Sequence, residues 1–99
     1  MTEFLTMDTF SGHVNTKFLM HYGDAKTAEI ELTSVEDVGS SSRQIQFSLL
    51  FLAPHDAPLA QSIYKLEHDK LGKLDVFLVP VGKDARGVEY QAIFNRPVE

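Results

Sequence analysis

Gly72-Lys-Leu-Asp-Val-Phe-Leu-Val-Pro-Val-Gly82 is the stretch of sequence that decides the fold. Successive side chains of a strand point to opposite faces, and from Val76 to Val81 both of these alternating sets are apolar. The β-branched and aromatic content and the flanking glycines favour a strand over a buried helix. Pro80 has no N–H, so it must lie near the end of the strand, at a bulge or at an unpaired edge. The stretch therefore predicts a short strand that is covered on both faces.

The remainder of the chain is dominated by similar short segments with turn residues between them. Five further strands are expected over residues 15–22, 27–35, 43–53, 59–68 and 88–95. Val35 falls one residue out of phase with the alternation before it, which predicts a bulge or strand end near residues 33–34. Six strands without alternating helices are typical of antiparallel β proteins. The sequence predicts a mainly β fold, either a compact antiparallel six-stranded, partly closed barrel or a curled meander sheet.

Residues 1–99 are expected to form a single β domain, because a chain of this length has room for one core. Three parts are expected: a helical N-terminal segment (1–14), an antiparallel β meander (15–95) and a tail (96–99). Phe4, Met7 and Phe10 recur at a spacing of three residues and predict an apolar stripe on a short helix. We expect this helix to pack on a sheet face or to cover a barrel end.

Net charge and composition limit which binding partners and which cellular location are expected. The net charge is −5, with 14 acidic and 9 basic residues, and the basic residues are scattered. This pattern predicts that neither nucleic acid nor an anionic membrane is a partner. The chain has no cysteine, and its first residues lack the basic and apolar regions of a secretory signal. A cytoplasmic location is therefore expected.

The residue pattern shows no reactive constellation. His13, His21, His55 and His68 lack the spacing of a zinc site. His68 and Asp69 are adjacent, so on a strand they point to opposite faces and the acid cannot readily orient the imidazole. There is also no Gly-x-Ser-x-Gly motif for a serine nucleophile. We expect a non-enzymatic domain without catalytic residues, metal or cofactor.

Three segments carry a resemblance to a known family: Phe47-Ser-Leu-Leu-Phe-Leu-Ala-Pro54, Leu71-Gly-Lys-Leu-Asp-Val-Phe-Leu-Val-Pro-Val-Gly82 and Tyr90-Gln-Ala-Ile-Phe-Asn95. They resemble a family of small bacterial domains of unknown function, and the resemblance covers nearly the whole chain. It implies an accessory or assembly role near phage-tail-like proteins. Since the shared patterns are core patterns, the resemblance implies no functional residue.

Two function hypotheses follow. The preferred one is a structural, interaction or assembly module that uses surplus apolar strand surface to contact an unidentified protein or a second copy of the chain. The alternative is a small-molecule-binding barrel whose mouth is formed by residues 40–43 and 55–56, with Arg43, His55 and Asp56 as the candidate contact residues. The alternative predicts a cavity lined by Phe47, Phe51, Leu66 and Phe77.

Overall fold

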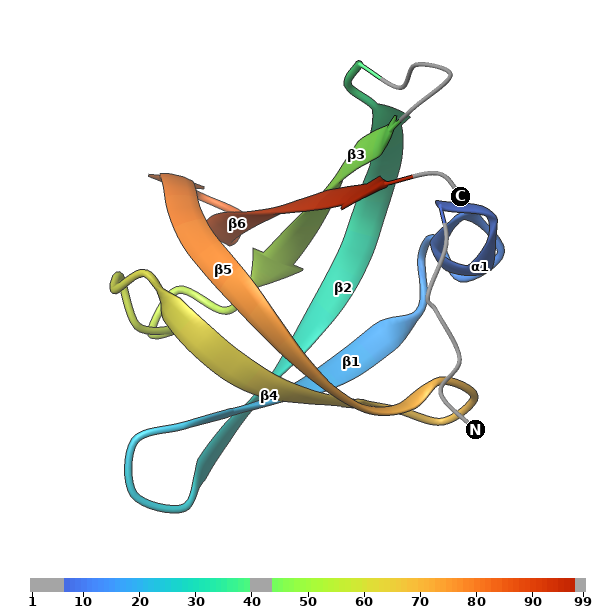
Figure 1. Cartoon of the computed structure of the whole chain (residues 1–99). Coiled ribbons are helices and arrows are strands. Elements are labelled where there is room, and N and C mark those ends of the chain that lie inside the picture. Colours follow the sequence, from blue (N-terminus) through green and yellow to red (C-terminus); the bar gives the residue numbers. More distant parts are fainter. Residues whose placement is uncertain (1–6, 40–43, 98–99) are drawn as a thin grey trace.

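Six antiparallel strands close into a barrel in the computed structural model of the chain (Figure 1). The structure describes residues 7–39 and 44–97. The elements are α1 (Met7–Ser11), β1 (Lys17–Tyr22), β2 (Lys26–Asp37), β3 (Gln44–Ala53), β4 (Ser62–His68), β5 (Gly72–Asp84) and β6 (Gly87–Pro97). The prediction of a mainly β, six-stranded antiparallel barrel with a short N-terminal helix is confirmed. The barrel is closed, where the sequence predicted partial closure or a curled sheet.

The order of strands around the barrel is β1-β2-β3-β6-β5-β4, and β4 returns to pair with β1. Two three-stranded meanders are therefore joined, and the predicted single meander over residues 15–95 is wrong. The reason lies in the connection 54–61, which contains Pro54 and Pro58. It is too long and too proline-rich for a tight hairpin, so β4 does not pair with β3. β6 takes that place beside β3 instead.

Two irregularities in the ladders lie where the sequence predicts them. The register between β2 and β3 shifts between Leu32 and Ser34. The register between β5 and β6 shifts between Pro80 and Gly82, because the proline ring cannot continue the ladder. Both shifts increase the local twist, which helps a six-stranded sheet to close.

The barrel interior is filled by apolar side chains from every strand. Fully buried members include Phe18, Met20, Ile30, Leu32, Phe47, Leu49, Phe51, Leu66, Leu78, Val88 and Tyr90. Phe10 of α1 is also fully buried, with its ring 6.0 Å from that of Phe47 and 5.5 Å from that of Phe94. The prediction that the helix packs on the barrel is thus confirmed for Phe10. Phe4 lies outside the described residues, as does the side chain of Met7.

β5 differs from its prediction in one respect that matters for function. Val76 and Leu78 point into the core, whereas Phe77 and Val81 on the other face are about half exposed, at 51% and 49%. The prediction that β5 is covered on both faces is therefore wrong for the isolated chain. Within residues 7–39 and 44–97, no helix has the length and apolar character needed to cross a membrane.

Candidate functional site

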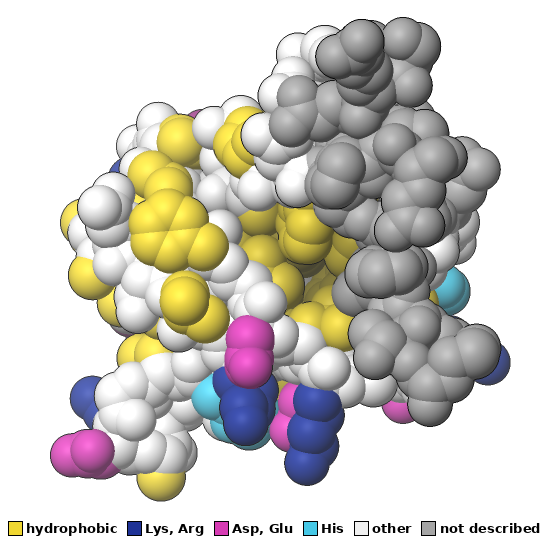
Figure 2. Space-filling model, in the orientation of Figure 1, with side chains coloured by type: hydrophobic (Ala, Val, Ile, Leu, Met, Phe, Trp, Pro, Cys, Tyr) yellow, Lys and Arg dark blue, Asp and Glu magenta, His cyan; other side chains and the backbone are white. Residues whose placement is uncertain are grey.

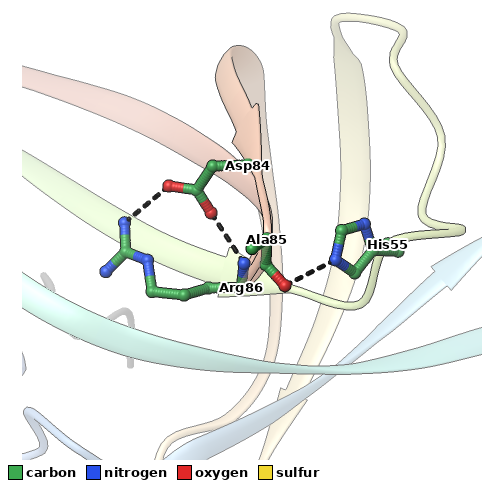
Figure 3. Close-up of polar contacts among 4 residues, drawn as sticks. All are labelled: His55, Asp84, Ala85 and Arg86. Atoms are coloured by element: carbon green, nitrogen blue, oxygen red, sulfur yellow. Dashed lines mark hydrogen bonds and ion pairs between the residues drawn. The ribbon is translucent and has the colours of Figure 1, made fainter.

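His55 is one of the three residues that the sequence singled out, and it lies exposed in the connection between β3 and β4. Its Nε2–H donates a hydrogen bond to the carbonyl oxygen of Ala85, at 2.7 Å (Figure 3). Beside it, Asp84 accepts hydrogen bonds from the backbone N–H and the Nη2 of Arg86 at 2.8 and 3.2 Å, which hold the pKa of Asp84 below its usual value. His55 therefore ties a loop to the β5–β6 hairpin, which is a structural role.

The structure describes one of the other two predicted site residues. Asp56 is exposed in the same connection, and Arg43 lies outside the described residues. β3 runs for ten residues and ends at this connection, and its length is about 30 Å. The hydrogen bond from the Val38 N–H to the Gln46 carbonyl lies near the far end of β3 from His55. The prediction of one mouth formed by residues 40–43 and 55–56 stays a prediction, because residues 40–43 lie outside the described residues.

The predicted ligand cavity is wrong. Phe47, Phe51 and Leu66 are fully buried and pack in the core, whereas Phe77 lies on the outside of the barrel. The error arose because Phe77 was placed on the inner face, although Val76 and Leu78 occupy that face. The four side chains cannot line one cavity.

His68, which the sequence pattern did not mark as a site residue, is buried and hydrogen-bonded through both ring nitrogens. His68 ends β4 and is only 8% exposed. Its Nε2 is 3.0 Å from the hydroxyl of Thr16, and its Nδ1 accepts hydrogen bonds from the N–H groups of Lys70 and Leu71 at 3.0 and 3.2 Å. The ring lies 4.4 Å from that of Phe18.

His13 completes this cluster from the segment that precedes β1. Its ring lies edge-on to that of His68, at 4.8 Å. Burial lowers the pKa of His68, and the nearby His13 and Lys70 lower it further, while Asp69 opposes them. The sequence held one signal for this burial, because His68 follows Tyr64 and Leu66 at the period of two of an inward-facing strand. Its contacts with Thr16 and His13 join segments far apart in the chain and could not be found from the pattern.

A groove of about 710 Å³ runs beside His68. Phe18 and Leu19 line it together with charged side chains of both signs, which are Lys17, Glu29, Glu67, Asp69 and Lys70. Across the part of the chain that the structure describes, no group of three or more His, Asp or Glu residues could hold a metal ion.

A further feature of the surface is an apolar face on the outside of β4, β5 and β6. We call it the outer apolar face and define it by Ile63, Phe77, Val79, Val81 and Ile93. Ile63 and Phe77 are direct cross-strand partners, and Val79 is the partner of Gln91, two residues before Ile93. Ile63 is 67% exposed and Ile93 58%. In Figure 2 hydrophobic side chains gather left of centre, over β5.

Charged residues border the outer apolar face in balanced pairs. Along β4 and β5, Lys65 is the direct partner of Asp75, and Glu67 is the direct partner of Lys73. Such cross-strand pairs of opposite charge cancel locally. The face and its border therefore carry little net charge, although the chain as a whole carries −5.

Comparison with known proteins adds a family assignment. The model of a family described as a domain of unknown function (DUF6916) matches residues 5–94. Neither the curated proteins nor the solved structures gave a significant match.

Proposed function

The chain belongs to the DUF6916 family of domains of unknown function, and from its geometry we propose that it is a non-enzymatic interaction domain that self-associates through the outer apolar face. The observation that carries the proposal is the exposed apolar surface on the outside of β4, β5 and β6, formed by side chains that the core does not use. An accessory or assembly role, including one in a phage-tail-like structure, is the process that we propose for such a domain. The proposed location is the cytoplasm, and neither nucleic acid nor a membrane is a proposed partner.

The size of the face supports a protein partner. Ile63, Phe77, Val81 and Ile93 are 49–67% exposed. At roughly 100 Å² each they leave about 400 Å² of apolar surface open, which is the size of the largest apolar patch on a typical monomer, and such patches are often functional. A standard interface covers about 800 Å² per partner, of which about 57% is apolar. The outer apolar face and its polar border can supply that area.

Charge favours a second copy of the chain as the occupant. Two copies with a net charge of −5 each repel wherever acidic surface meets acidic surface. The outer apolar face avoids this repulsion, because Lys65 with Asp75 and Glu67 with Lys73 cancel at its border. A twofold-symmetric contact places the same patch of each copy against the other and needs no complementary partner surface.

The test is light scattering coupled to size-exclusion chromatography, over a range of protein concentrations. We expect the wild-type mass to rise toward that of a dimer and Phe77→Glu to stay monomeric, because a buried unpaired carboxylate is costly. Val38→Glu is the matched control, since Val38 is 46% exposed and lies outside the face. A wild-type protein that is monomeric at every concentration would overturn the proposal, as would an equal loss of dimer in both variants.

A second candidate function, small-molecule binding, is favoured by the groove beside His68, whose volume of about 710 Å³ is in the range of ligand pockets. Screening a small-molecule library by NMR tests it. Shifts confined to the backbone of Phe18, Leu19 and Glu67 would support this function, and no shifts at these residues would exclude it.

A further inference from the structure

The barrel closes where β1 pairs with β4, and this pairing is the shortest strand ladder among the described residues. Leu19 pairs with Glu67, Met20 with Leu66 and His21 with Lys65. β4 and β5 are paired along the whole of β4, and β3 and β6 along the whole of β3. His68 lies at the end of this short ladder and contacts both sides of it. Its Nδ1 binds the turn between β4 and β5, and its Nε2 binds Thr16, directly before β1.

We infer that His68 is an acid-sensitive latch, which in its neutral form holds the β4–β5 turn against the segment before β1 and releases it when protonated. The inference does not depend on the proposed self-association, because the latch and the outer apolar face involve different side chains.

The hydrogen bonds allow only one form of the imidazole. The hydroxyl of Thr16 donates its proton to the carbonyl oxygen of His13, at 2.5 Å, so toward His68 it can only accept. Nε2 of His68 must therefore carry a proton. Nδ1 faces the N–H groups of Lys70 and Leu71, which can only donate, so Nδ1 must be unprotonated. A proton on Nδ1 would point at two donors and would break both bonds to the turn.

The surroundings of His68 oppose protonation on balance. The ring is packed against Phe18 and His13, and a second imidazolium at His13 would repel the first. The charged and titratable groups around it are His13, Lys17, Glu29, Glu67, Asp69 and Lys70. A second histidine contact lies nearby, because Nε2 of His21 is 3.0 Å from the carboxylate of Glu67. A readout local to the β4–β5 turn separates His68 from this contact.

The direction of the pH dependence follows from the difference between the pKa of His68 in the closed turn and its pKa in the open turn. The pKa of His68 is lowered in the closed form, mainly by burial, and returns toward about 6.5 when the turn opens. Closing is therefore fully favoured above about pH 6.5 and weakens as the pH falls toward the lowered value. Because one proton is taken up, the ratio of open to closed turn rises up to about tenfold per pH unit in that window.

The experiment is NMR on the full chain between about pH 8 and about pH 5. It follows the ring nitrogens of His68 and the amide exchange of Lys70 and Leu71, corrected for the intrinsic pH dependence of exchange. We expect the Nε2–H tautomer at high pH, and a ratio of open to closed turn that rises up to about tenfold for each pH unit below about pH 6.5. An Nδ1–H tautomer, or turn protection that does not change with pH, would overturn the inference.

Two variants distinguish protonation of His68 from an effect of low pH on the protein as a whole. His68→Asn keeps an acceptor near Nδ1 but cannot titrate, so the pH dependence at Lys70 and Leu71 should disappear. His55→Asn is the matched control, because His55 lies in the β3–β4 connection, and it should leave the dependence intact. If His68→Asn does not fold, Thr16→Val serves instead. It removes the partner of Nε2–H, so the turn should open at a higher pH than in the wild type. Persistence of the pH dependence in His68→Asn, or an unchanged opening pH in Thr16→Val, would refute the latch.

Discussion

Gly87 is the position at which one added methyl group should damage the fold most specifically. Its φ is +141°, and a Cβ placed on it would lie 1.9 Å from the carbonyl oxygen of Ala53. Real Cβ atoms essentially never come closer than 3.0 Å, so Gly87→Ala must push the β5–β6 hairpin away from β3 by about 1 Å. The oxygen belongs to the backbone of the last residue of β3, so it cannot rotate away as the end of a flexible side chain could. The variant should therefore disturb the pairing of Ala53 with Val88 and the hydrogen bond from His55 to Ala85.

The expected loss in the free energy of unfolding is the sum of backbone strain and lost hydrogen bonds. A residue other than glycine at a strained φ costs about 1–3 kcal/mol. Each backbone hydrogen bond that is lost or stretched adds about 0.5–1.5 kcal/mol. We expect Gly87→Ala to lower the free energy of unfolding by about 3–5 kcal/mol. At about 4–8 °C per kcal/mol for a domain of this size, the midpoint of thermal unfolding should fall by more than 10 °C.

Gly72→Ala is the matched control for this prediction. Gly72 also has a positive φ, +80°, but a Cβ placed there would meet no atom within 4 Å. Only the backbone strain remains, so we expect a loss of about 1–2 kcal/mol. The difference between the two variants, about 2 kcal/mol, isolates the steric contact with Ala53.

The assay is urea unfolding followed by circular dichroism, because the chain has no tryptophan to report by fluorescence. Low protein concentration keeps self-association out of the measured free energy. If Gly87→Ala and Gly72→Ala lose the same free energy within about 0.5 kcal/mol, the close approach of the hairpin to β3 is not a determinant of stability.

Three further predictions concern the core and the anchored connection. The hydroxyl of Tyr90 donates to the carbonyl oxygen of Pro58, and burial raises its pKa, so Tyr90→Phe should lower the free energy of unfolding by about 1–2 kcal/mol, measured by urea unfolding. Tyr22→Phe, at a partly exposed tyrosine, should change it by less than about 0.5 kcal/mol, and equal losses in the two variants would contradict the anchoring role. Leu66→Ala should cost about 2–5 kcal/mol in the same assay, because Leu66 is fully buried, and a loss below about 1 kcal/mol would contradict its place in the core. In His68→Asn, thermal unfolding midpoints should decline less between about pH 7 and about pH 5 than in the wild type, because the lowered pKa of His68 contributes stability that is complete above about pH 6.5 and is lost as the pH falls below it. An equal decline would contradict that assignment.

Much of the fold could be predicted from the alternation of side chains. Ile30 and Leu32, and Leu49 and Phe51, fall on the inner face as their period of two requires, and the bulge after Leu32 follows from the phase shift at Val35. The strand order could not be predicted in this way. Pairing of β3 with β6 depends on contacts between distant segments, and the alternation within each strand is the same for either partner.

The candidate site was harder to predict for a related reason. An apolar residue on the second face of β5 has the same signature whether it is covered or exposed, so Phe77 was expected to be buried. The surplus of apolar side chains did indicate that some strand surface would remain outside the core. His55 was selected because it lies in a loop, and the structure gives it a structural hydrogen bond instead. His68 was set aside with Asp69, because its real partners, Thr16 and His13, are remote in sequence.

The most direct test of self-association through the outer apolar face is an isotope-filtered NOE measurement on a mixture of labelled and unlabelled protein. It detects only contacts between different copies of the chain. We predict intermolecular NOEs from the ring of Phe77 and the methyl groups of Ile63 and Ile93, because these side chains are exposed in one copy and would be buried between two. Intermolecular NOEs that arise from another surface, or none at concentrations where the mass is that of a dimer, would contradict the account.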